Sequence, residues 1–311
     1  MKFSERLSEL RREIVVGMGP LITSDYYLLE VPTHTNVGDY LIWQGEIDYL
    51  STLPYKCLGM HSSVTFRFDD IDSDAVILLN GGGSFGDVWP ESMEFKLNVV
   101  MRYPDNKIVF FPQSVHFQDC VTEKRALTEL SKHSNLTICV RDKYSHEYLS
   151  NAGLKSVLIP DMAFFFTPKG FEYMVSSCGL LVTRDDRESK YCVDLAAAKM
   201  NEDLHLSDWS TIDRRSFVTL FFDATVQIAS RIKLFLPLVD FFSNMFYRKY
   251  IIYEGCRHIG AASFVYATRL HAGVLALLMG KNVVLFDNSY GKISRFYETW
   301  LQSCDEVSLR R

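Results

Sequence analysis

The chain has few of the features that mark secreted, metal-binding, membrane-spanning or nucleic-acid-coating proteins. Its seven cysteines are scattered without a CxxC pair, and such an odd set is typical of reduced thiols in a cytosolic protein. No apolar run approaches the roughly 20 residues that a membrane-spanning helix needs. The net charge of −5 argues against non-specific binding to nucleic acid, but it leaves room for a local basic site that holds a small anion. We therefore expect neither a metal ion nor a nucleic-acid partner.

The beginning of the chain does not read as a signal peptide. Residues 1–20 instead predict an amphipathic helix that is closed by glycine and proline. A hydrophobic content of 48% in 311 residues fits a full core, in one large α/β domain or in two of ordinary size.

Apolar strands and helix-length segments alternate along the whole sequence. This alternation predicts an α/β fold with a parallel sheet and helices on both of its faces. The strands expected in the first half are Tyr26–Val31, Tyr55–Gly59, Ala75–Asn80, Lys107–Pro112, Leu136–Arg141 and Val157–Pro160. The helices expected between them include Tyr40–Leu50, Pro90–Arg102, Val121–Lys132 and Lys143–Ala152.

A domain boundary is predicted near residue 168. Asp161–Gly170 places proline and glycine after a dense aromatic cluster, and a new strand is expected at Gly179–Thr183. Residues 1–168 and 169–311 would then form two similar α/β domains. The cleft between them is where we expect the active site.

The most informative segment lies near the C-terminus, where Arg269 and His271 stand between the expected strand Phe264–Ala267 and an apolar helix. A second strand, Asn282–Phe286, leads into the polar loop 287–292. The carboxyl end of a parallel strand and the N-terminus of a helix both favour an anionic ligand. Arginine supplies a fork of donors for carboxylate or phosphate, and histidine exchanges a proton near neutral pH. The alternative is a solvated arginine beside a core histidine.

The loop His34–Glu46 follows the first strand and contains Asn36, Gly38 and Asp39. Gly38 would let the chain turn tightly, and Asn36 and Asp39 are residue types that cap helices. Since the loop lies at the carboxyl end of a strand, Asp39 could instead orient a substrate hydroxyl.

A glycine-rich segment, residues 80–87, follows another apolar strand. Gly81, Gly83 and Gly86 formally satisfy GxGxxG, but the next strand ends in residues 112–114 (Pro-Gln-Ser) rather than in the acidic residue that would bind a ribose. No Gly-Lys-Ser/Thr follows, so a P-loop is also excluded. We expect a glycine loop whose bare backbone approaches a ligand. The residues that would contact it are Gly81, Gly82, Gly83 and Ser84.

Two further arginines follow strands. Arg141 stands at a strand end before Asp142, which resembles a helix N-cap, so that it either reaches the cleft or pairs locally. Arg184 is the first residue beyond the strand Gly179–Thr183 and is well placed to face the cleft. Together with Arg269 it would hold a ligand that carries more than one anionic group.

Eight motifs follow one another along the chain: NVGDYLIWQGE, LLNGGGSFGDVWPE, FFPQSVHF, VRDKYSHEYL, PDMAFF, LVTRDDRE, ATRLHAGVLALLMGK and DNSYGKISRFYETW. As a series they resemble the polysaccharide pyruvyltransferase family, most closely its bacterial members encoded with exopolysaccharide or capsule genes. The resemblance implies a glycosyltransferase-B-like fold of two Rossmann-type domains. It also implies transfer of pyruvate from phosphoenolpyruvate to two hydroxyls of a sugar, giving a cyclic ketal and phosphate without a metal or nucleotide cofactor.

The resemblance also implies roles for single residues. Arg269 and His271 would act as phosphoenolpyruvate binder and general acid/base, and Arg184 would bind the carboxylate or the phosphate. Asp39 is the candidate for gripping the sugar, so that residues 1–168 form the acceptor side and the second domain the phosphoenolpyruvate side. The last loop would close the anion site through Asn288, Ser289, Tyr290 and Lys292.

The acceptor implied in this way is a lipid-linked oligosaccharide in the cytoplasm. Phe217–Tyr250 is rich in Phe and Leu and carries four basic residues, a mixture that could lie peripherally on the inner face of a membrane. The alternative is a core or oligomer-forming helix pair hinged at Pro237. Two other functions remain open. One is a sugar-nucleotide glycosyltransferase of the same architecture, although this sequence has no glutamate in the loop 287–292, where that class usually carries one. The other is an inactive binding member of the biosynthetic complex.

Overall fold

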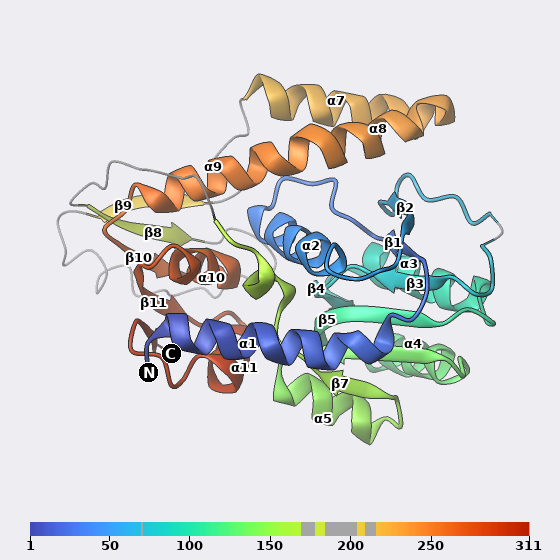
Figure 1. Cartoon of the computed structure of the whole chain (residues 1–311), viewed down its shortest axis with the longest axis horizontal. Coiled ribbons are helices and arrows are strands. Elements are labelled where there is room, and N and C mark those ends of the chain that lie inside the picture. The colour runs from blue at the N-terminus through green and yellow to red at the C-terminus, as the bar shows by residue number, and fades with distance from the viewer. Residues whose placement is uncertain (70, 169–177, 184–203, 209–215, 311) are drawn as a thin grey trace.

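The computed structural model describes residues 1–69, 71–168, 178–183, 204–208 and 216–310. In this part of the chain the strands form two sheets, and every strand pairing is parallel. The protein therefore has an α/β fold with parallel sheets, as the alternating sequence pattern predicts (Figure 1).

The first sheet is built from residues that precede the expected domain boundary. Its strand order is β2-β1-β3-β5-β6-β7, with β4 paired to β5. The strands are β1 (Tyr26–Leu29), β2 (Cys57–His61), β3 (Val76–Leu79), β4 (Gly82–Gly86), β5 (Ile108–His116), β6 (Leu136–Val140) and β7 (Ser156–Leu158). The helices of this half are α1 (Phe3–Met18), α2 (Val37–Leu50), α3 (Pro90–Arg102), α4 (Cys120–Ser131) and α5 (Lys143–Asn151), followed by the 3-10 helix η2 (Met162–Phe165).

The second sheet has the order β12-β11-β10-β8-β9. Its strands are β8 (Gly179–Thr183), β9 (Leu204–Asp208), β10 (Phe264–Ala267), β11 (Asn282–Phe286) and β12 (Val307–Arg310). Its helices are α9 (Arg248–Gly260), α10 (Leu270–Leu278) and α11 (Lys292–Trp300), and the hairpin of α7 (Phe217–Arg231) and α8 (Leu236–Phe242) projects beyond them (Figure 1).

Strand β4 is the main departure from the predicted elements. The glycine-rich segment was expected to be a loop, but Gly82–Gly86 pairs in parallel with β5, which continues beyond Pro112 to His116. A glycine is required at Gly86, because a Cβ there would lie 1.7 Å from the carbonyl oxygen of His116. The GxGxxG spacing therefore reflects close packing of two strands rather than a dinucleotide-binding turn.

A single apolar core connects the two sheets. One cluster of buried side chains contains Leu28 of β1 together with Val182 of β8 and Val265 of β10. The N-terminal helix α1 strengthens this connection, because the Phe3 N–H donates to Glu306 (2.9 Å) beside β12 and both chain ends lie at the same corner (Figure 1). The predicted boundary at residue 168 lies between the sheets, but the division into two domains stays a prediction.

The aromatic segment 217–250 forms helices α7 and α8 and the beginning of α9. The turn between α7 and α8 lies in the 3-10 helix η4 (Lys233–Phe235) and not at Pro237, which stands in the first turn of α8, where its missing N–H costs nothing. From the end of α8 the chain passes through a π-helical turn, Ser243–Tyr247, directly into α9. Among the residues that the structure describes, no helix is both long and apolar enough to cross a membrane.

Candidate functional site

A cavity of about 460 Å³ opens where strands of both sheets end. Three segments dominate its wall: residues 30–39 after β1, residues 80–84 after β3, and residues 269–272 after β10. In the first sheet, the connections from β1 and β3 leave in opposite directions, because β2 and β5 lie on opposite sides of this pair. Such a switch point is where open α/β sheets bind ligands.

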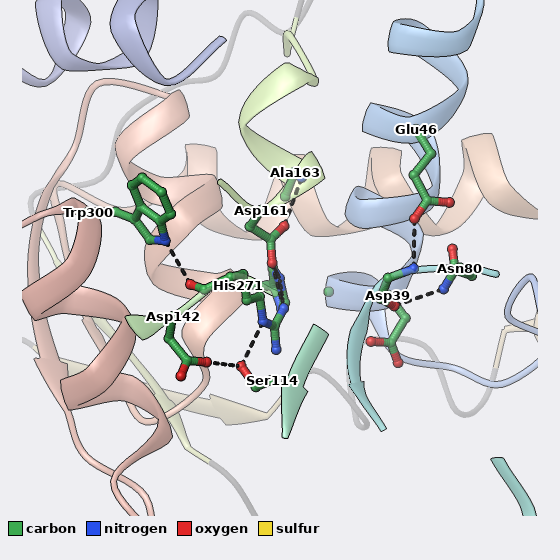
Figure 2. Close-up of polar contacts among 12 residues, drawn as sticks. Asp39, Glu46, Asn80, Ser114, Asp142, Asp161, Ala163, His271 and Trp300 are labelled. Carbon is green, nitrogen blue, oxygen red and sulfur yellow. Dashed lines mark hydrogen bonds and ion pairs between the residues drawn. The ribbon is translucent and has the colours of Figure 1, made fainter. Parts of the chain in front are cut away.

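Arg141, Asp161 and His271 meet at the centre of this site. Arg141 follows β6, Asp161 caps η2, and His271 lies in the first turn of α10. Arg141 Nη1 lies 2.5 Å, and His271 Nε2 3.3 Å, from the same oxygen, Asp161 Oδ2 (Figure 2). Burial raises the pKa of Asp161, but the charges of His271 and Arg141 outweigh this and hold it well below its ordinary value. The carboxylate therefore stays ionised beside the Arg141 guanidinium.

The Arg141 guanidinium is completely buried, and most of its donors are satisfied. Its Nε donates to Ser114 Oγ (3.0 Å), and that hydroxyl donates to Asp142 Oδ2 (2.8 Å). Asp142 also caps α5, as predicted, by accepting from Ser145 N–H (2.8 Å). Among the residues that the structure describes, none is a hydrogen-bond partner of the nitrogen Arg141 Nη2. A buried charged donor without a partner is costly, so this atom points to a ligand.

Lys292 and Arg141 converge on Gly83. A Cβ at this glycine would lie 2.0 Å from Lys292 Nζ and 3.1 Å from Arg141 Nη2. Lys292 begins α11, and its side chain reaches across from the second sheet to the strand β4 of the first. Because Gly83 has no side chain, two cations share a space that an anionic group can enter.

Asp39 forms the polar wall opposite this centre. Its Oδ2 accepts from Asn36 Nδ2 (2.7 Å) and lies 2.7 Å from His34 Nε2. Burial raises the pKa of Asp39, but the hydrogen bond with His34 and the charges of His34, His271 and Lys292 prevail and lower it to about 2. Asp39 is consequently a carboxylate at neutral pH and can accept hydrogen bonds from hydroxyl groups.

Gly38 has a different role from the one expected. It does not make a tight turn, because it lies in the first turn of α2 and is not among the glycines with positive φ. A Cβ at Gly38 would instead lie 2.9 Å from both Cβ and Nδ1 of His271. The glycine is needed for the close approach of α2 to the imidazole.

A second polar cluster in the cavity wall escaped the sequence analysis. The amine of Lys96 is fully buried and donates to Glu30 (2.7 Å), Ser84 (3.0 Å) and Ser92 (2.7 Å). Burial lowers the pKa of Lys96, and the neighbouring carboxylate of Glu30 opposes this. Glu30 has a φ of 66°, in the left-handed region that few non-glycine residues adopt. A lysine within the apolar pattern of α3 was the only sequence signal for this cluster.

Two more buried polar groups lie at the carboxyl end of β3. Glu46 of α2 accepts from Gly81 N–H (2.7 Å), and burial raises its pKa well above the ordinary value, which favours the neutral carboxyl group (Figure 2). Asn80 donates to the Gly81 carbonyl (3.1 Å), while its own Oδ1 is buried and finds no hydrogen-bond partner within the described part of the chain. The cavity thus offers both an unpaired donor, on Arg141, and an unpaired acceptor.

The structure brings most of the predicted site residues to one cavity and leaves a few elsewhere. Gly82 is not on its wall, Ser289 is exposed, and Tyr290 stacks on His116 with ring centroids 4.1 Å apart. Asn288 is buried and accepts from the Lys292 N–H (2.7 Å). Arg184 lies outside the described residues. The predicted site residues that do lie on the cavity wall are Asn36, Gly38, Asp39, Gly81, Gly83, Ser84, Arg141, Arg269, His271 and Lys292.

Over the described ranges, no group of three or more His, Cys, Asp and Glu side chains is placed to hold a metal ion. The polar groups of the cavity are instead arranged in ion pairs and hydrogen bonds with one another.

Two relatives of this chain are named as pyruvyl transferases. The chain is similar to the putative pyruvyl transferase EpsO of Bacillus subtilis, with 29% identity over 99% of this chain and 94% of that protein. It is also similar to pyruvyl transferase 1 of Schizosaccharomyces pombe, with 27% identity over 91% of this chain and 71% of that one. A functionally uncharacterised protein of Klebsiella pneumoniae shares the fold, with a TM-score of 0.68 and 15% identity over 97% of this chain and 98% of that one. The profile of the family described as polysaccharide pyruvyl transferase matches residues 36–290, and the chain belongs to that family.

Proposed function

We propose that this protein transfers pyruvate from phosphoenolpyruvate to two hydroxyls of a sugar in a surface-polysaccharide precursor, forming a cyclic ketal and releasing phosphate. Membership of the family supports pyruvate transfer. The observation that carries the proposal is a single cavity whose wall combines His271 with three basic side chains, Arg141, Arg269 and Lys292. In this proposal the two sheets are the cores of two Rossmann-like domains in a glycosyltransferase-B-like arrangement, and no cofactor takes part.

The proposed donor has two anionic groups, and we assign each of them to a different part of the cavity. The phosphate or carboxylate would enter the space beside Gly83, where Arg141 Nη2 lacks a partner and Lys292 Nζ approaches. The other anionic group would lie against Arg269, which stands at the N-terminus of α10. Charge-assisted hydrogen bonds and the helix dipole both favour an anion there.

His271 is the proposed proton donor. In the reaction, a proton moves to the methylene carbon of phosphoenolpyruvate, and positive charge develops on the neighbouring carbon. One sugar hydroxyl attacks that carbon, the bond to phosphate breaks, and the second hydroxyl closes the ring. One hydroxyl proton returns to the imidazole and the other leaves with the phosphate, so that protons balance. Asp161, 3.3 Å from His271 Nε2, stabilises the protonated imidazole and holds its orientation.

The acceptor sugar would occupy the side of the cavity formed by the first sheet. Asp39 is ionised at neutral pH and accepts hydrogen bonds, and the buried oxygen Asn80 Oδ1 offers a further acceptor without a partner. Since hydroxyl groups are donors, both oxygens suit a sugar. We propose that the sugar is carried by a lipid on the cytoplasmic side of a membrane.

Thermal unfolding with added ligands tests the donor site. Phosphoenolpyruvate should raise the melting temperature with increasing concentration, because a ligand that binds only the folded state stabilises it. Arg269→Ala should lose this shift, while Arg125→Ala, which changes an exposed arginine paired with Glu94, should keep it. His271→Ala should keep the shift but release no phosphate when the acceptor is present.

The same titration separates the proposal from its rival. A shift with UDP or GDP and none with phosphoenolpyruvate would indicate a sugar-nucleotide glycosyltransferase. Wild-type phosphate release by His271→Ala would show that the imidazole is not the proton donor. A shift with phosphoenolpyruvate that survives in Arg269→Ala would remove this arginine from the donor site.

A further inference from the structure

The helical hairpin of α7 and α8 exposes an unusual amount of apolar surface. More than half of the exposed large apolar side chains among the described residues lie between Phe217 and Tyr253. The most prominent are Phe217 and Leu234, each 81% exposed, and Phe221, Phe241 and Phe246 are about half exposed. We call this surface the hairpin face. Isolated apolar side chains on a surface are ordinary, but a contiguous set marks a place of interaction.

The hairpin face is the outer side of a firmly packed element. On its inner side, Phe222 stacks on Tyr247 with centroids 3.9 Å apart, and Val239 is completely buried. Asp240 accepts from Thr65 Oγ1 (2.6 Å) and lies 2.7 Å from His61 Nδ1, which fixes α8 to the end of β2. The hairpin is thus amphipathic, with one side in the core and the other at the edge of the molecule (Figure 1).

The exposed charges of this segment have one sign. Between residues 217 and 250, the charged side chains classed as exposed among those described are Arg231, Lys233 and Lys249. Asp223 and Asp240 are only partly exposed, and the latter is paired inward with His61. The whole chain carries a net charge of −5, so that this local excess of positive charge stands out from the rest of the sequence.

We propose that the hairpin face binds the interface of a lipid bilayer that contains anionic lipids. Exposed Phe and Leu side chains enter the region between headgroups and acyl chains, and flanking cations attract anionic headgroups. A second copy of the chain fits less well, because a symmetric dimer through this face would gather two sets of the same exposed cations, Arg231, Lys233 and Lys249, at one interface. This proposal does not depend on the chemistry proposed for the cavity.

The inner side of the same hairpin adjoins the cavity through two contacts. Thr35, on the cavity wall, lies 3.2 Å from the hydroxyl of Tyr247. Ser63, also on the wall, belongs to the turn in which Thr65 donates to Asp240 of α8. A protein held to a membrane by this face would therefore keep the cavity close to the bilayer, where a lipid-linked sugar resides.

Vesicle flotation of the full chain tests the proposal. We expect binding to vesicles of equal parts phosphatidylcholine and phosphatidylglycerol, weaker binding to phosphatidylcholine alone, and a decrease with salt. Leu234→Glu should reduce the partition coefficient by about tenfold or more, since it replaces an inserting side chain by a charge that the lipids repel. Lys233→Glu should reduce binding to the anionic vesicles. Val121→Glu is the matched control, because Val121 is 72% exposed on α4, outside the hairpin face, and should bind like the wild type.

Three results would each overturn the proposal. They are no binding to either type of vesicle, equal binding by the wild type and Leu234→Glu, and equal binding of the wild type to vesicles with and without phosphatidylglycerol. Light scattering tests the alternative that a second copy of the chain binds the hairpin face. If the wild type is a dimer and Leu234→Glu is a monomer, the face is a dimer interface. The phosphoenolpyruvate-dependent melting shift should be the same in Leu234→Glu and wild type. Failure of the membrane proposal can thus be distinguished from failure of the donor site.

Discussion

At the level of single residues, the contact between Gly38 and His271 links the two sides of the cavity. Gly38 lies on α2 of the first half and His271 on α10 of the second, and a methyl group on the glycine would meet the imidazole. Asp39, the next residue, contributes a carboxylate whose pKa of about 2 depends partly on the charge of the same imidazole. A small change at residue 38 therefore acts on both walls of the proposed site.

Gly38→Ala should lower the rate of phosphate release by about 10²-fold, since displacement of a reacting group by about 1 Å can cost that much. Its free energy of unfolding should change by less than about 2 kcal/mol, because crowding is partly offset by the higher helix propensity of alanine. Enzyme kinetics and urea denaturation measure the two quantities. Gly19→Ala is the control, because Gly19 has an ordinary helical backbone and nothing within 4 Å of the added Cβ. A fully active Gly38→Ala would mean that the imidazole position is not critical.

At the level of elements, the ion pairs of Asp161 join η2, the end of β6 and the start of α10. Both Arg141 and Asp161 are buried, with side chains 0% and 1% exposed. Removing one partner of a buried pair leaves an uncompensated charge, and this is more damaging than loss of a surface pair. The ion pairs of the site therefore also hold β6, η2 and α10 together.

Asp161→Asn should lower the free energy of unfolding by about 3–5 kcal/mol, measured by urea denaturation. Asp305→Asn is the matched control, because Asp305 is 76% exposed and pairs with the N-terminal amine 3.3 Å away. The control should cost less than about 1 kcal/mol. Equal stability of both variants would show that Arg141 does not need the carboxylate in the folded protein.

The sequence predicted the helices and strands better than it predicted the side-chain contacts between them. The predicted strands and helices of the first half are confirmed with small shifts at their ends, because apolar runs alternate clearly with amphipathic segments. Strand β4 was missed because its glycines carry no apolar pattern. The pairs of Glu30 with Lys96 and of Asp161 with His271 join residues 66 and 110 positions apart, and no local pattern reports such distances.

For the site, too, local sequence patterns identified single residues but not the contacts between distant segments. Arg269 and His271 could be selected because they stand between a strand and a helix, and the cavity contains both. Whether Arg141 faces the cleft or pairs locally was left open, and the structure shows that it does both. Which groups of a residue remain unpaired, as on Arg141 and Asn80, depends on packing from distant segments.

At the level of the whole molecule, the cavity and the core both span the two sheets. The cavity wall combines loops after β1 and β3 with the loop after β10, and the apolar core runs from Leu28 to Leu285. Helix α1 reinforces this union, because Arg6 donates to the carbonyl of Trp300 (3.1 Å) in the second half. Relative motion of the two halves would expose part of this shared core, which is unfavourable.

The shared core predicts that the chain unfolds in one cooperative transition. Leu28→Ala in β1 and Leu285→Ala in β11 form a matched pair, because both leucines are completely buried in the same cluster. Each should lower the free energy of unfolding by about 2–5 kcal/mol and move the whole transition, as seen by calorimetry and by near-UV circular dichroism. Two transitions, one sensitive only to Leu28→Ala and the other only to Leu285→Ala, would contradict this expectation. Such a result would mean that the halves fold independently and that the cavity forms only when they come together.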